Sequence, residues 1–308
     1  MTTAWERGPA HRYGLTRAVS LEKQARWSCV ETQEKSYIVM TYGKRRVAAI
    51  TAAITAAAVV AVHSSIQHNP VSPEHVQSSV LISPHNLTGP LTGMVVGIDP
   101  GHNGANGTYP SYINKLIWNG RERETCDTTG TRTDGGYTEA QFNFQVAMFL
   151  RAHLLRDGAQ VTMTRTSNYG VGPCVTRRAQ ILNDSRANVA IDIHADGGPP
   201  SGRGFAVLEP VADGPNDQVI ATSEAFGRDV RWAFLRYTKI PLSTYDGDDG
   251  ISYRNDLAGL NLTSVPKILI ECGNMRNATD AAFLVSTAFQ QDIARALEAA
   301  IIRFLRKG

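Results

Sequence analysis

The chain has 308 residues, enough for one large domain or two small ones, and its 42% hydrophobic content is ordinary for a globular protein. The net charge is +3, but the first 62 residues hold nine of the 31 Lys and Arg residues and four of the 28 Asp and Glu residues, which leaves 22 basic against 24 acidic residues in the remainder. Nucleic-acid binding needs a basic face, so this near-neutral remainder argues against nucleic acid as a partner.

A hydrophobic segment near the N-terminus has the layout of a secretory signal peptide. Three basic residues, 44–46, precede sixteen uncharged residues, 47–62. We expect residues 40–63 to be the signal peptide of an exported protein; a retained membrane anchor and a buried core helix are the alternatives. Because a signal peptide lies at the N-terminus, residues 1–39 are interpreted as an upstream leader outside the mature protein, and a translation start at Met40 is the favoured explanation.

The rest of the chain divides into a linker and one domain. Residues 64–93 are rich in Ser, Pro, His and Asn, which is typical of a linker. From Met94 onward, short apolar runs alternate with segments of helical periodicity. This alternation predicts an α/β domain over residues 94–308, whose mostly parallel, twisted sheet has helices on both faces. The expected strands are 94–99, 159–165, 188–194, 202–210 and 266–271, and the expected helices are 139–155, 175–187, 217–238 and 279–306.

Four polar side chains stand where an expected strand ends or an expected helix begins. His102 follows the first strand through a Pro-Gly turn, and His194 and Glu271 end two later strands. Glu139 opens a helix behind Thr138, a suitable N-cap. Catalytic groups gather at the carboxyl ends of strands in α/β sheets, and a helix that follows a strand starts at that same edge. The four side chains are therefore expected to lie together.

Two histidines and one carboxylate form the ligand set of catalytic zinc, which keeps a fourth position open for water. Zinc lowers the pKa of that water to about 7, and a second carboxylate can then accept and return protons. Glu271 suits this second role because it emerges from an apolar strand, where partial loss of solvent raises the pKa of a carboxyl group.

Each of these residues also has a purely structural interpretation. His102 could be a surface residue of a loop, Glu139 could simply favour the helix dipole, and Glu271 could pair with an arginine. None of the spacings is short and diagnostic in the manner of HExxH. The residues alone therefore lead to a metallohydrolase hypothesis and no further.

The ordered set of motifs resembles a known family, the zinc-dependent N-acetylmuramoyl-L-alanine amidases of the amidase-3 type. The resemblance runs from about Met94 to the C-terminus, and its closest likeness is to mycobacterial members without separate wall-binding repeats. The segments that carry it, in the family's order, are VVGIDPGHNG, TEAQFNFQVAMFLRAHL, VTMTRTS, TRRAQILNDSRAN, VAIDIHADG and VPKILIECGNMRNATDAAFL.

This resemblance implies an α/β fold and one zinc ion per chain, with His102, Glu139 and His194 as ligands and Glu271 as the catalytic carboxylate. It implies an enzyme that hydrolyses the amide bond between N-acetylmuramic acid and the L-alanine of the stem peptide in peptidoglycan. A zinc peptidase that cuts within the stem peptide and a catalytically inactive peptidoglycan-binding protein are the alternatives. We expect a monomer in the periplasm or cell wall, without stable membrane contact once the signal peptide is removed.

The cysteines predict one disulfide bond. Cys29 precedes the expected signal peptide, and Cys272 follows Glu271 in an apolar strand, where we expect a small, buried and reduced core residue. Cys126 and Cys174 remain, both in expected loops on the side of the sheet that carries the four polar residues. Because exported cysteines tend to be oxidised, we expect these two to pair.

Overall fold

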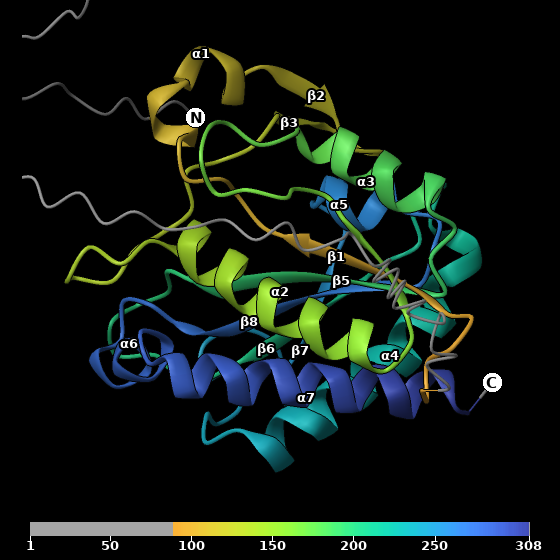
Figure 1. The fold of residues 1–308 in the computed structure, drawn as a ribbon. Helices are drawn as coiled ribbons and strands as arrows, with labels where there is room; N and C mark the ends of the chain where they lie inside the picture. Colours follow the sequence, from red (N-terminus) through yellow and green to blue (C-terminus); the bar gives the residue numbers. More distant parts are fainter. Residues whose placement is uncertain (1–88, 308) are drawn as a thin grey trace, which may run out of the picture. The chain divides into compact units, whose positions relative to one another are not determined.

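A six-stranded sheet lies at the centre of residues 89–307, the part of the chain that this computed structural model describes (Figure 1). The strand order is β4-β1-β5-β8-β6-β7; the first four strands are parallel to one another, β6 runs antiparallel to β8, and β7 is parallel to β6. The prediction of a mostly parallel sheet is therefore confirmed. The strands are β1 (Val95–Pro100), β4 (Gln160–Met163), β5 (Val189–Asp196), β6 (Ala206–Pro210), β7 (Ile251–Arg254) and β8 (Lys267–Asn274).

Helices cover both faces of this sheet (Figure 1). One face carries α2 (Glu139–Arg156), α4 (Ile220–Tyr237) and α7 (Thr287–Leu305), and the other carries α3 (Val175–Asp184) and α5 (Ala258–Asn261). A two-stranded hairpin of β2 (Leu116–Trp118) and β3 (Arg123–Thr125) lies beyond α3 and α5. The short elements are the 3-10 helices η1 (Asn106–Thr108) and η2 (Asp217–Val219) and the helices α1 (Pro110–Ile113) and α6 (Ala278–Leu284).

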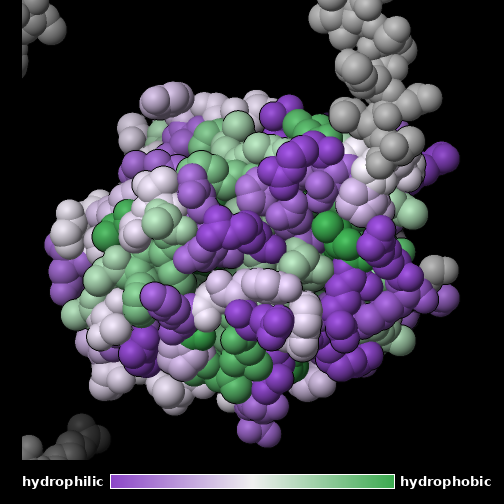
Figure 2. All heavy atoms as spheres, turned by 60° about the horizontal axis from the view of Figure 1, so that its bottom comes forward, coloured by the Kyte–Doolittle hydropathy of each residue, from purple (hydrophilic) through white to green (hydrophobic). Residues whose placement is uncertain are grey.

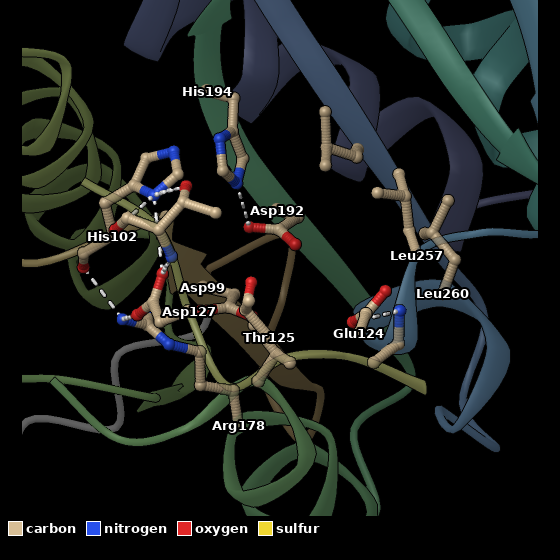
Figure 3. A pocket seen from close by; sticks show the side chains of 16 residues that line it. Asp99, His102, Glu124, Thr125, Asp127, Arg178, Asp192, His194, Leu257 and Leu260 are labelled. Carbon is tan, nitrogen blue, oxygen red and sulfur yellow. Dashed lines mark hydrogen bonds and ion pairs between the residues drawn. The ribbon is translucent and has the colours of Figure 1, made fainter. Parts of the chain in front are cut away.

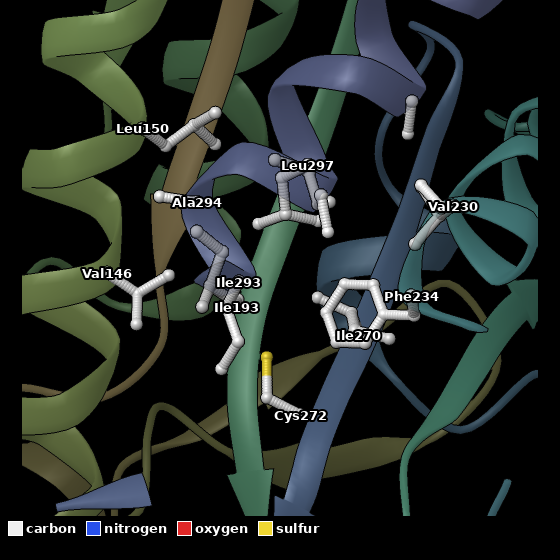
Figure 4. Packing of buried hydrophobic residues seen from close by; sticks show 14 of the residues in the cluster. Val146, Leu150, Ile193, Val230, Phe234, Ile270, Cys272, Ile293, Ala294 and Leu297 are labelled. Carbon is white, nitrogen blue, oxygen red and sulfur yellow. The ribbon is translucent and has the colours of Figure 1, made fainter. Parts of the chain in front are cut away.

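The main hydrophobic core fills the space between the sheet and the layer of α2, α4 and α7 (Figure 4). Alternate residues of β5 and β8 point into it, among them Ile193 and Ile270, while Phe234 and Leu297 close it from the helices. Cys272 is fully buried in this core, as expected from its apolar strand. Because side chains of a strand alternate between faces, the polar residues between these apolar ones point to the α3/α5 face.

The outer surface of the α4 and α7 layer is mixed in character (Figure 2). Hydrophilic side chains are interspersed with smaller hydrophobic areas, and the partly exposed large apolar residues of α4 are Trp232, Leu235 and Tyr237. Among residues 89–307, no helix combines the length and the apolar character that a membrane crossing requires. The expected leader (1–39), the expected signal peptide (40–63) and most of the expected linker (64–93) lie outside the described residues.

The expected single closing helix over 279–306 is wrong. The structure has two helices, α6 and α7, that are interrupted at Val285 and Ser286. Ser286 is the N-cap residue of α7, and the Gln290 side chain donates to the carbonyl of Leu284 at 2.8 Å. The break is thus stabilised because the carbonyl at the end of α6 has a hydrogen-bond partner outside its own helix. The hairpin, β7, α1 and α5 were not expected.

Candidate metal centre

The first ligand candidate, His102, lies in a tight loop at the carboxyl end of β1. Its φ is 58°, in the left-handed region that non-glycine residues rarely adopt. Two buried arginines hold this conformation: Arg178 donates to the carbonyl of His102 at 2.7 Å, and Arg165 donates to the carbonyl of Pro100 at 2.8 Å. The loop is therefore fixed by hydrogen bonds from two other segments of the chain.

Glu139 is the first residue of α2, as expected. The backbone N–H of Gln141 donates to the Thr138 hydroxyl, which caps the helix. The Glu139 side chain is 4% exposed and turns back toward the edge of the sheet, where its Oε2 accepts a hydrogen bond from the backbone N–H of Thr131 at 2.9 Å. This bond orients the carboxylate and leaves Oε1 facing the histidines.

His194 and Glu271 are register partners on the adjacent strands β5 and β8. The sequence pattern suggested that each residue ends its strand. This is wrong, because β5 continues to Asp196 and β8 to Asn274. The register between the two strands shifts between His194 and Asp196, so this edge of the sheet is irregular where the two side chains stand.

The structure brings His102, Glu139 and His194 together, with one ligand atom from each within 4.8 Å of the others. Glu139 Oε1 lies 3.1 Å from His102 Nε2 and 2.8 Å from His194 Nδ1. Two imidazole nitrogens and a carboxylate oxygen form the donor set of catalytic zinc, which leaves a fourth position open. The residues present therefore fit a zinc ion.

Glu271 contributes a polar atom without a partner. Its Oε2 is buried and accepts no hydrogen bond from the described residues. Burial raises the pKa of Glu271 well above its usual value, although His194 opposes this effect. A buried carboxylate with one unengaged oxygen beside His194 is suited to hold a water molecule and to exchange protons with it.

The pKa values of the three ligand candidates are set by burial, by one another and by two neighbouring aspartates. Burial alone would lower the pKa of both histidines, but Glu139 and Asp127 raise the pKa of His102 to about 9, and Asp192 and Glu139 raise that of His194 well above its usual value. Burial alone would raise the pKa of Glu139, but the histidines hold it well below its usual range. A metal ion binds neutral imidazole, so its binding would displace these protons.

A cavity of about 190 Å³ adjoins the histidines on the α3/α5 face (Figure 3). His102 and His194 line it together with two buried aspartates that the sequence analysis did not single out, Asp127 and Asp192. Asp192 stands two residues before His194, and period-two alternation places both side chains on one face, a signal that could have identified it. No comparable spacing links Asp127 to His102.

The two cysteines expected to pair, Cys126 and Cys174, lie next to each other, but both are free thiols in the structure. Cys174 Sγ is 3.1 Å from the carbonyl oxygen of Cys126. Burial, followed by the neighbouring Cys174 thiol, raises the pKa of Cys126 to about 12. The two loops therefore meet, and the disulfide itself stays a prediction.

Comparisons with known proteins agree with this architecture. Residues 96–303 match a family model described as N-acetylmuramoyl-L-alanine amidase. The chain is 40% identical over 235 residues to the N-acetylmuramoyl-L-alanine amidase Rv3717 of Mycobacterium tuberculosis, a match that covers 74% of this chain and 91% of the relative.

Two solved mycobacterial structures are also similar. The N-acetylmuramyl-L-alanine amidase Ami1 of Mycobacterium smegmatis has 39% sequence identity and a TM-score of 0.67, over 71% of this chain and 99% of that one. The apo form of Ami1 from Mycobacterium abscessus has 38% identity and a TM-score of 0.66, over 70% of this chain and all of that one. By its fold, its sequence and the span of the family match, the chain belongs to the N-acetylmuramoyl-L-alanine amidase family.

Proposed function

We propose that the chain is a zinc-dependent peptidoglycan hydrolase that cleaves the amide bond between N-acetylmuramic acid and the L-alanine of the stem peptide. The observation that supports zinc dependence is the convergence of His102, Glu139 and His194 on one point, with Glu271 on the adjacent strand. The substrate class is supported by membership of the amidase family.

The proposed roles follow from the position of each side chain. His102, Glu139 and His194 would hold one zinc ion per chain. When bound, zinc supplies a Lewis acid that polarises a carbonyl group and lowers the pKa of a water molecule. Glu271 holds and orients the attacking water through its unengaged oxygen.

Proton transfer is the chemical task of Glu271 in this proposal. Its carboxylate accepts a proton from the water as the water oxygen bonds to the lactyl carbonyl carbon. The C–N bond then breaks, and the same carboxyl group returns the proton to the departing L-alanine nitrogen. The products are a free lactyl carboxylate on the sugar and a stem peptide with a free amino terminus.

The remaining parts of the proposal concern organisation and location. The catalytic domain would span residues 94–308 and act as a monomer. Peptidoglycan lies outside the cytoplasm, so the enzyme would be exported through the signal peptide at 40–63. Residues 64–93 would be a linker, and the protein would have no stable membrane contact once the signal peptide is removed. A bond between Cys126 and Cys174 would form after export.

Mass spectrometry of digested muropeptides tests the reaction. We expect intact stem peptide and peptide-free sugar as products, and no products after zinc is removed with a chelator. Shortened peptide still attached to sugar would identify a peptidase instead. Bound but uncleaved muropeptide, in a preparation shown to contain zinc, would identify an inactive peptidoglycan-binding protein.

A further inference from the structure

Five charged side chains are buried on the α3/α5 face of the sheet, behind the two histidines, and Figure 3 shows all of them except Lys267. Asp99 (β1), Arg178 (α3) and Lys267 (β8) form the centre of the group; Asp127 (the loop before α2) and Asp192 (β5) form its ends. Each is at most 6% exposed. We refer to these five residues as the buried ion-pair chain.

Each member of the buried ion-pair chain contacts the next. Asp127 Oδ2 lies 3.3 Å from Arg178 Nη2, and Arg178 Nη1 donates to Asp99 Oδ1 at 2.9 Å. Lys267 Nζ donates to Asp99 Oδ2 at 3.2 Å and lies 3.3 Å from Asp192 Oδ2. Charged groups thus form an unbroken path from Asp127 to Asp192.

The two ends of this path each meet one histidine, at the ring nitrogen that faces away from Glu139. Asp127 Oδ1 lies 3.4 Å from His102 Nδ1, and Asp192 Oδ1 lies 3.3 Å from His194 Nε2. The opposite nitrogens, Nε2 of His102 and Nδ1 of His194, both face Glu139 Oε1. His102 Nδ1 also lies 3.2 Å from the carbonyl oxygen and 3.2 Å from the hydroxyl oxygen of Thr128, the residue after Asp127. A proton on each of these outer ring nitrogens leaves both lone pairs directed at one point, the arrangement that a shared metal requires.

Stabilisation of the fold is only a weak explanation for the buried ion-pair chain. Removing a charged group from water costs free energy, and a buried ion pair often stabilises a protein no more than apolar residues of similar volume. The buried ion-pair chain contains three carboxylates and two cations, and the buried guanidinium of Arg165, which donates to the carbonyl of Pro100, adds a third positive charge close by. The group is distinctive in that both of its ends are carboxylates, each within 3.4 Å of one histidine ring, and two carboxylates in these positions favour a cation between His102 and His194.

We infer that the buried ion-pair chain is a positioning device for the metal site, which holds His102 and His194 in opposite tautomers and couples the orientation of the two rings. The inference rests on the proposed function, since it takes both histidines as ligands of one metal ion. Asp99 is the central member and bonds Thr164, Arg178 and Lys267. It is a positioning residue because it acts on the histidines through other residues.

A second buried carboxylate supplies a matched control. Asp229 is 3% exposed and pairs with Arg303 and Lys307, at 2.7 and 2.6 Å. It lies beside Met94 and Asn188, which precede β1 and β5, and therefore at the opposite end of these strands from the histidines. Replacement of either aspartate by asparagine removes one buried carboxylate from its ion pairs, although the cations that pair with Asp229 are about half exposed, and only Asp99 is connected to the metal site.

The experiment compares Asp99→Asn with Asp229→Asn in the full-length protein. Zinc dissociation constants are measured by competition with a chelator, and thermal unfolding of each metal-free variant is followed by circular dichroism. We expect Asp99→Asn to weaken zinc binding by about tenfold, the lower end of the range for groups that contact metal ligands directly, because Asp99 acts through Arg178 and Lys267. Asp229→Asn should lower the unfolding midpoint and keep the wild-type zinc affinity.

Wild-type zinc affinity in a folded Asp99→Asn variant would overturn the inference. An equal loss of affinity in both variants would overturn it as well, because zinc affinity would then follow general stability. If Asp99→Asn does not fold, Asp192→Asn, at the His194 end of the buried ion-pair chain, decides in the same manner: weakened zinc binding supports the inference, and wild-type affinity overturns it. A wild-type protein that binds no zinc refutes the proposed function itself, which is a distinguishable result.

Discussion

Gly101 lies directly against the imidazole ring of His194. A β-carbon at position 101 would stand 2.1 Å from His194 Nε2 and 2.1 Å from its Cε1, far inside van der Waals contact. Position 101, in the Pro-Gly turn after β1, therefore requires glycine, because any side chain there would collide with the ring of His194, 93 residues later in the sequence. This relationship ties the loop of His102 to the ring position of His194.

Gly101→Ala should consequently displace the His194 ring and weaken the metal site. We expect zinc affinity and amidase activity to fall by about tenfold or more, as for other changes that disturb ligand orientation. Gly107→Ala is the matched control, because its β-carbon would lie no closer than 3.7 Å to Thr129 Cγ2. Zinc content after dialysis and muropeptide hydrolysis measure the effect. Full zinc content and activity in Gly101→Ala would contradict the proposed geometry.

Glu271→Gln should separate metal binding from catalysis. Glutamine has nearly the same shape as glutamate but cannot accept the water proton, so hydrolysis should slow by about 10²–10⁴-fold. Zinc affinity should stay close to wild type because Glu271 is not one of the three ligands. Glu139→Gln, by contrast, should lose zinc and activity together. Release of stem peptides by Glu271→Gln or Glu271→Ala at the wild-type rate would show that the assignment of Glu271 is wrong.

The candidate site could be predicted from the sequence because its residues lie on or next to helices and strands that have clear sequence patterns. His194 and Glu271 lie on apolar strands, and Glu139 follows a recognisable N-cap, so strand-end and helix-start rules bring them to one edge of the sheet, although both strands continue two or three residues further. The α/β class follows from the same alternation of strands and helices. Resemblance to a family then supplied the ligand roles that spacing alone left open.

The residues behind the site were not accessible in the same way. Asp99 and Lys267 form an ion pair but lie 168 residues apart in the sequence. In its own segment, each is a single polar residue in or beside an apolar run, so the sequence gives no sign of the pairing. β7 was missed because its four residues follow an Asp- and Gly-rich loop, and they become a strand only by pairing with β6. Pairing of this kind is a tertiary effect that local propensity does not contain.

The stability of the domain should depend on pH through Glu209, a β6 residue that is 2% exposed and packs against Gly227 of α4. Burial, reinforced by Glu224, raises the pKa of Glu209 from its usual 4.5 to about 7. A raised acid pKa means that the folded state binds its proton more tightly, so stability is lost as the pH rises from about 4.5 to about 7. Above this window the ionised carboxylate destabilises the fold.

Glu209→Gln, which stays neutral, should therefore have a higher unfolding midpoint than the wild type at pH 8, and the difference should vanish near pH 4.5. Glu122→Gln, at an exposed position, is the control for the chemical change itself. Thermal unfolding at a series of pH values measures both. A difference between Glu209→Gln and wild type that is constant with pH would rule out this role for Glu209.

The oxidised domain 94–308 should contain one disulfide, between Cys126 and Cys174, and one free thiol, that of Cys272. The sulfur of Cys174 already lies against the backbone of Cys126, and the core position of Cys272 keeps it away from any partner. The bond would close a loop of about 49 residues, which stabilises by about 4 kcal/mol in the chain-entropy estimate, less any strain in the native geometry.

Thiol counting on the unreduced, unfolded domain is the direct measurement: one free thiol fits the prediction, and three would refute it. Unfolding under oxidising and reducing conditions gives an independent readout, because the wild-type domain should lose stability on reduction. Cys126→Ser and Cys174→Ser should each abolish that redox difference, since one partner of the bond is gone. Cys272→Ala should lower stability through the cavity it leaves in the core, yet keep the redox difference. A redox difference that persists in Cys126→Ser would show that another pair of cysteines is joined.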